Sequence, residues 1–180
     1  MKEIKGQTLI EVLIALAIAI LVVAAIAIVI LSALNNAQFS KNQNNASQYA
    51  QQGMEIVRNL RSSNWSSFKN LAADPANNKY CLDKGHTTLQ KTGSLENDIR
   101  NGNAGCQGIG SEHASGQNVD NYAREVDLEN PGTLPCAVSE IKATVIVSWA
   151  DTKCTDANNV YCHKAQIVSC FSTGNILPTL

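Results

Sequence analysis

Residues 5–28 read KGQTLIEVLIALAIAILVVAAIAI, and this stretch sets the architecture of the whole chain. Residues 12–31 are twenty consecutive positions occupied only by Ala, Val, Ile and Leu. Since a helix rises about 1.5 Å per residue, this run can cross the hydrocarbon core of a bilayer, which is about 30 Å thick. Lys2 and Lys5 precede the run, and no Lys or Arg follows before Lys41. The positive-inside rule therefore predicts a cytoplasmic N-terminus and an extracytoplasmic remainder.

The apolar run is better explained as a retained helix than as a cleaved secretory signal. An ordinary signal peptide has an apolar centre of about 7–15 residues, followed by a cleavage site in a polar stretch. Here the Ala-x-Ala triplets at 15–17 and 25–27 lie inside the apolar run, where that peptidase does not normally cut.

Glu11 is an ionisable residue at the start of this run. A carboxylate near the edge of the hydrocarbon core is costly unless it is paired or reaches the headgroups. One interpretation is that Glu11 only extends back to the headgroups from the helix end. The other is that it pairs with a cation from another molecule. Its position alone leaves both interpretations open.

The same residues resemble the N-terminus of type IV prepilins and pseudopilins. That family has a short basic leader ending in glycine, a glutamate at the fifth residue after it, and then a long apolar helix. Gly6 matches the leader glycine, Gln7 becomes the first mature residue and Glu11 is the fifth. The string from Thr8 to Val12 also fits the family pattern. One departure is Gln7, because the family most often has Phe or Met there.

The resemblance implies processing and assembly. A membrane-embedded aspartyl prepilin peptidase would cut after Gly6 and methylate the new amine of Gln7. That cationic amine would pair with the glutamate corresponding to Glu11 on a neighbouring subunit, a device for register more than for stability. The implied partners are prepilin peptidase, other pilin or pseudopilin subunits, an inner-membrane assembly platform and the lipid bilayer. The implied location is the cytoplasmic (inner) membrane before assembly and a cell-surface filament afterwards.

We expect an α+β, pilin-like fold, in which a long N-terminal helix packs on a small antiparallel sheet. Residues 7–52 contain no Pro or Gly, so nothing locally interrupts a helix predicted from Thr8 to about Leu60. Its second half has one apolar face, formed by Ala46, Tyr49, Ala50, Gly53, Met54, Val57 and Leu60. The expected divisions are a leader at 1–6, a membrane and assembly half at 7–34, an amphipathic half at 35–64 and an extracytoplasmic head at 65–180.

The head is predicted to contain three strands after an irregular region. Residues 65–121 have little periodicity and are expected to be a connecting region with a short helix near 95–100. Alternating patterns predict strands within 121–129, 140–151 and 160–171. One face of the middle strand carries Ile141, Ala143, Val145, Val147 and Trp149.

Six cysteines follow the apolar run, namely Cys81, Cys106, Cys136, Cys154, Cys162 and Cys170. An even number in a small domain beyond a membrane helix favours disulfides, and the chain lacks the tight C-x2-4-C pair typical of zinc sites. Pairing the last two strands as a hairpin brings Cys154 to Cys162 and Cys170 within a loop's reach of Cys136. Cys81 and Cys106 are left to connect the irregular region.

No other residues indicate chemistry. The net charge is −1 and no basic stripe is present, so a nucleic-acid partner is not expected. There is no phosphate-binding loop and no pair of carboxylates placed for acid–base catalysis, so we expect neither an enzyme nor a cofactor. Asp151 and Asp156 are too few oxygen ligands to predict calcium, and no metal is expected. His86, His113 and His163 are isolated in the sequence and are expected to be surface groups.

The predicted function is that of a structural subunit, and of a minor one because the head is irregular and carries three possible disulfides. The filament would be a type IV pilus, a type II secretion pseudopilus or a DNA-uptake pseudopilus. The alternative is a single-pass, membrane-anchored, disulfide-stabilised binding domain that does not polymerise.

Overall fold

The structure is a computed structural model that describes residues 7–73, 78–85, 87–91, 119–129, 134–155 and 161–173. The chain forms two compact units, residues 1–41 and residues 42–180. The long helix α1 contributes its first part to one unit and its last part to the other.

Helix α1 (Gln7–Ser63) contains 57 residues. It confirms the predicted continuous helix, which ends three residues later than the sequence suggested. Asn64 follows it in an extended conformation and caps the next helix, α2 (Trp65–Leu71), because its side-chain Oδ1 accepts a hydrogen bond from the backbone N–H of Ser67 at 2.9 Å. An Asn at this position satisfies one of the backbone donors that a helix start leaves without a partner.

Within the described residues, five strands form one antiparallel sheet: β1 (Lys79–Cys81), β2 (Gln90–Lys91), β3 (Ala123–Glu129), β4 (Ile141–Trp149) and β5 (His163–Phe171). Their spatial order is β2-β1-β3-β4-β5, so β5 lies at one edge. The last three strands confirm the three predicted from alternation. The fold is therefore α+β and pilin-like, as expected.

The expectation of an irregular region over 65–121 was wrong in part. Helix α2 lies within it and buries Phe68, while β1 pairs with β3 and buries Tyr80 and Cys81. These elements are too short to show periodicity, and they form because a cap and a neighbouring strand stabilise them. The helix expected near 95–100 lies outside the described residues.

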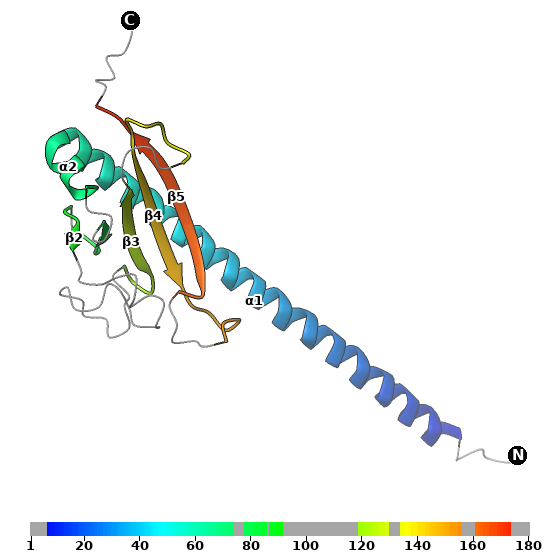
Figure 1. The fold of residues 1–180 in the computed structure, drawn as a ribbon. Coiled ribbons are helices and arrows are strands. Elements are labelled where there is room, and N and C mark those ends of the chain that lie inside the picture. The colour runs from blue at the N-terminus through cyan, green and yellow to red at the C-terminus, as the bar shows by residue number, and fades with distance from the viewer. Residues whose placement is uncertain are drawn as a thin grey trace, which may run out of the picture. The chain divides into compact units, whose positions relative to one another are not determined.

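The core of the second unit lies between the sheet and the part of α1 from residue 42 onward (Figure 1). Alternate β4 residues beginning with Ile141 face this helix, and each is at most 3 % exposed. The predicted apolar face of α1 meets them through its small and apolar residues, of which Ala46, Ala50, Met54 and Val57 are buried. Because Ala46 and Ala50 have small side chains, the backbone of α1 can approach β4 closely. The β4 side chains that it meets are mostly β-branched.

Gly53 marks a close approach between α1 and the sheet. A Cβ at this position would lie 2.8 Å from Val145 Cγ1 and 3.2 Å from Arg124 Cδ. We therefore expect Gly53→Val to lower the free energy of unfolding of the head by about 1–3 kcal/mol, the usual cost of overpacking. The measurement is chemical denaturation of the full chain in detergent. Gln52→Val places the same side chain on the exposed face, and equal stabilities of the two variants would contradict the expectation.

Candidate functional site

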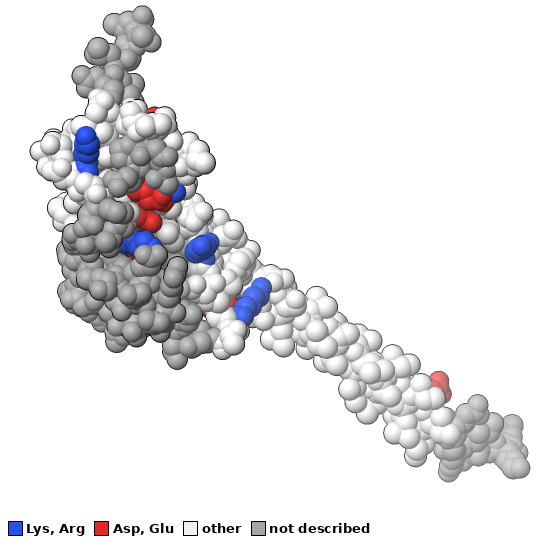
Figure 2. Space-filling view, in the orientation of Figure 1, with Lys and Arg blue, Asp and Glu red and all other residues white. Residues whose placement is uncertain are grey.

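The described part of the first unit, residues 7–41, presents an almost entirely apolar helical surface. The large apolar side chains from Leu9 to Leu34 are between 52 % and 70 % exposed. Glu11 and Lys41 are the charged residues within 7–41, and Figure 2 shows how little charge this surface carries. By length and composition, the helix can cross a membrane. Such a surface is stable in lipid or against other apolar helices rather than in water.

Two of the residues predicted to take part in processing and assembly, Gln7 and Glu11, lie at the start of this helix. Gln7 is the first residue of α1, and Glu11 follows it by one helical turn, with an exposed side chain. Gly6 lies outside the described residues. The structure therefore places Glu11 on the apolar surface described above, one turn from the residue whose amine cleavage would expose.

Arg124 connects three elements of the head, a role that sequence reasoning missed. Its side chain is 3 % exposed. Its Nε donates to the Leu82 carbonyl at 2.9 Å, Nη2 to the Asp83 carbonyl at 3.1 Å and Nη1 to the Tyr49 carbonyl at 3.4 Å. Burial lowers the pKa of Arg124, and the nearby Asp83 carboxylate opposes that shift. The available signal was its alternation with Val126 on the strand face that meets α1.

A second polar connection joins α1 to the segment before β3. The Tyr49 hydroxyl donates to Asp120 Oδ2 at 2.6 Å, and Lys84 pairs with the other oxygen of Asp120. The hydrogen bond to this carboxylate, with burial, raises the pKa of Tyr49 to about 12. Asp120 has φ = 53°, a left-handed conformation that Asp tolerates better than most residues. The contacts of Asp120 with Tyr49 and Lys84 therefore hold both α1 and the turn that leads into β3 in place.

Two disulfides hold the ends of the edge strand β5. Cys154 bonds to Cys162, which directly precedes β5, and Cys136 bonds to Cys170 near its end. Both pairings were favoured from the sequence, although Cys170 pairs in register with Lys142 rather than Ile141. Cys81 is also disulfide-bonded, whereas Cys106 lies outside the described residues, so the bond between these two stays a prediction.

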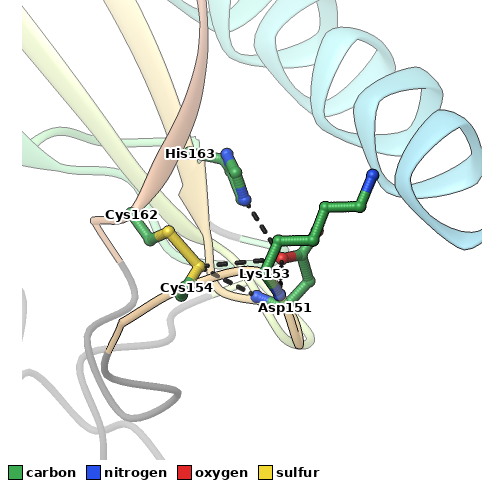
Figure 3. The surroundings of a disulfide bond; sticks show 5 residues. All are labelled: Asp151, Lys153, Cys154, Cys162 and His163. Carbon is green, nitrogen blue, oxygen red and sulfur yellow. Dashed lines mark hydrogen bonds and ion pairs between the residues drawn. A yellow bond between two sulfur atoms is a disulfide. The ribbon is translucent and has the colours of Figure 1, made fainter. Parts of the chain in front are cut away.

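The Cys154–Cys162 disulfide closes the β4–β5 loop beside a histidine and a carboxylate (Figure 3). His163 Nε2 lies 3.1 Å from Asp151 Oδ1, and the backbone N–H of Lys153 donates to the same oxygen at 2.8 Å. Although burial opposes it, these hydrogen bonds and the charges of His163 and Lys153 lower the pKa of Asp151. The Trp149 ring lies 5.5 Å from the imidazole.

The expectation that His163 is isolated was wrong, although its side chain is 25 % exposed. Trp149 and His163 are paired in the β4–β5 register, and this pairing brings the imidazole to the loop carboxylate. Alternation along β5 gave no sign of the contact, because it depends on the loop closing back. His86, His113 and Asp156 lie outside the described residues.

The sheet face opposite α1 contains a pocket of about 230 Å³ around a buried carboxyl group. Glu125 is 7 % exposed and accepts a hydrogen bond from the Tyr161 hydroxyl at 2.8 Å. Lys79, Asp127 and Lys164 also line the pocket. Burial raises the pKa of Glu125, while Tyr161 and Lys79 act in the opposite direction and Asp127 adds to the rise.

A raised pKa means that the folded state binds the Glu125 proton more tightly than the unfolded state does. The resulting stability is fully present below the unfolded pKa, about 4.3 for Glu, and is lost as pH rises through the folded value. We expect Glu125→Gln to be more stable than wild type at pH 8, with a difference that shrinks as pH falls to 4.5. Urea denaturation at both pH values measures this difference. Glu140→Gln, a half-buried carboxyl outside this pocket, is the control; an equal pH dependence in both variants would contradict the expectation.

Comparisons with known proteins identify the N-terminal segment. Residues 1–27 match the model of the prokaryotic N-terminal methylation motif. No curated protein and no solved structure matches the chain. The match covers the predicted leader, Gln7, Glu11 and most of the apolar run. The chain therefore carries the N-terminal signature of type IV prepilins and pseudopilins, joined to a pilin-like α+β fold.

Proposed function

We propose that this protein is a minor structural subunit of a type IV pilus-like or type II secretion-like filament. The observation that carries the proposal is the continuity of the methylation motif with the exposed apolar surface of α1. A helix that only anchors a protein in the membrane needs only to be apolar. This segment also has Gly6, followed by Gln7, whose amine cleavage would expose, and Glu11 at a fixed spacing. In this proposal the head serves as a folded, disulfide-closed surface.

In this proposal the chain has four parts. Residues 1–6 are a cytoplasmic leader that is removed, and residues 7–34 hold the subunit in the membrane and later in the filament. Residues 35–64 connect that segment to the head and form part of its core. The head, residues 65–180, lies outside the cytoplasmic membrane, where an oxidising environment allows its disulfides to form.

The role of Glu11 follows from the cost of charge in an apolar medium. After cleavage, Gln7 would carry a cationic amine and Glu11 a carboxylate, both at the start of an apolar helix. Each charge is expensive there unless an opposite charge is close. Pairing between neighbouring subunits satisfies both charges only in the correct register, so assembly is specified as well as permitted.

Co-expression with a prepilin peptidase tests the processing step. We expect cleavage after Gly6 and an N-terminal peptide beginning at Gln7 that is heavier by one methyl substitution. Gly6→Leu removes the close backbone approach that glycine allows, and we expect that variant to keep its leader. The measurement is mass spectrometry of the N-terminal peptide from the purified chain.

The same mass measurement also shows whether Gln7 keeps its N-terminal amine. A free N-terminal glutamine can cyclise, because its amine attacks the side-chain amide carbonyl and ammonia leaves. A peptide that has lost ammonia would have no cation to pair with Glu11 and would contradict the pairing model. An uncut chain under co-expression would favour the non-polymerising membrane-anchored domain instead.

A further inference from the structure

We propose that the described residues at the two ends of the β4–β5 loop form a binding site for Zn²⁺, or a similar thiolate-preferring divalent cation, when the Cys154–Cys162 disulfide is reduced. The four ligands would be the two thiolates, His163 Nε2 and an oxygen of Asp151. This site is separate from the N-terminal segment and does not depend on the proposed filament function.

The donor atoms already lie close together around the disulfide (Figure 3). The sulfurs of Cys154 and Cys162 and a ring nitrogen of His163 lie within 4.8 Å of one another. Asp151 Oδ1 lies 3.7 Å from Cys154 Sγ and 3.1 Å from His163 Nε2. Tetrahedral zinc with bonds of about 2.0–2.3 Å needs donor separations of about 3.3–3.8 Å. Reduction would therefore have to separate the two sulfurs, and the Asp151 carboxylate, which is near Cys154 Sγ and His163 Nε2, would have to move toward Cys162 Sγ to complete the set.

The surrounding groups hold these donors in place. His163 is fixed at the start of β5 and packs on Trp149 with ring centroids 5.5 Å apart. Asp151 Oδ1 accepts the backbone N–H of Lys153, and the Asp151 backbone N–H donates to Cys154 Sγ at 3.3 Å. Hydrogen bonds of this kind orient metal ligands and favour a charged sulfur, so an outer set of contacts for a metal site is present.

Reduction of the Cys154–Cys162 disulfide requires two electrons and two protons, which a dithiol can supply. The dithiol supplies two electrons and two protons, the S–S bond breaks, two S–H groups form and the reductant becomes a disulfide. Binding of Zn²⁺ then releases the two thiol protons to solvent, leaving two thiolates on the metal. The loop would remain cross-linked in both states, by sulfur in the oxidised form and by the cation in the reduced form.

The sequence does not reveal this site, because Cys154 and Cys162 do not form the tight C-x2-4-C pair that is typical of zinc sites. Cys154 and Cys162 are separated by seven residues, and the other two donors come from opposite sides of a hairpin. A second group, formed by Cys136, Glu140 and Cys170, also converges but contains no histidine. It provides an internal comparison.

The test uses the full chain in detergent, treated with a phosphine reductant and titrated with Co²⁺ alone. We expect one equivalent to bind with a thiolate-to-cobalt charge-transfer band, and Zn²⁺ to displace it. His163→Gln and Asp151→Asn should each weaken binding by at least about tenfold, because loss of even an outer-shell contact weakens metal binding by about 10–100-fold. Lys164→Gln, on the adjacent exposed residue, should bind as wild type does.

Alkylation of the reduced cysteines, mapped by mass spectrometry, shows which of them bind the metal. Zn²⁺ should protect Cys154 and Cys162 more strongly than Cys136 and Cys170. If reduction loosens the head, Zn²⁺ should restore its near-ultraviolet circular dichroism in wild type and not in His163→Gln, because metal binding stabilises the folded state. Absence of a charge-transfer band, protection confined to Cys136 and Cys170, or unchanged affinity in His163→Gln would each overturn the proposal.

Discussion

Replacing Glu11 with Gln is expected to reduce incorporation of the subunit into filaments by at least about a hundredfold while leaving cleavage and membrane insertion unchanged. The reason is that a neighbouring amine in an apolar interface would lose its counter-charge, at a cost of about 3 kcal/mol or more. Since about 1.4 kcal/mol corresponds to a factor of ten, two factors of ten is the smallest effect expected. Gln keeps the shape of Glu, so the variant removes little except charge.

Incorporation is measured by quantifying the subunit in sheared filaments, relative to the amount of processed chain in the membrane. Glu55→Gln is the matched control, because Glu55 is exposed on the part of α1 that belongs to the second unit and pairs with Arg58. Equal incorporation of the Glu11 and Glu55 variants would contradict the pairing model. It would favour the interpretation in which Glu11 only reaches the headgroups.

The second large effect is expected from Arg124→Leu, which should lower the free energy of unfolding of the head by about 3–5 kcal/mol. Leu can occupy much of the volume but leaves the carbonyls of Leu82 and Asp83 without the donors that Arg124 provides. The Tyr49 carbonyl adds less, because that contact is long at 3.4 Å. Chemical denaturation of the full chain in detergent measures the loss.

Two further variants separate packing from hydrogen bonding at this position. Arg124→Lys keeps the charge but cannot reproduce the divergent donors of a guanidinium, and its stability should fall between those of wild type and Arg124→Leu. Arg58→Leu changes an exposed arginine on α1 and should have a small effect. If Arg124→Leu were as stable as Arg58→Leu, the contacts to the carbonyls would contribute nothing to the fold.

The sequence by itself determined the parts of this protein whose physics is local. Twenty apolar residues and an absence of Pro and Gly specify a helix and its lipid-compatible surface, whatever the rest of the chain does. The roles predicted for Gly6, Gln7 and Glu11 depend on their spacing along the chain, which a sequence motif can detect, and residues 1–27 match such a motif. The alternation from Ile141 to Trp149 similarly predicted which face of β4 is buried.

Only the tertiary structure decided the features that depend on distant segments meeting. Arg124 became a connector because β3 places it between the Leu82 and Asp83 carbonyls and α1. His163 met Asp151 because the β4–β5 register and the loop disulfide bring both to one point. Gly53 matters because the sheet approaches α1 there. Hydrogen bonds, close contacts and ligand sets of this kind are set by three-dimensional distance, and no local pattern of residue types encodes that distance.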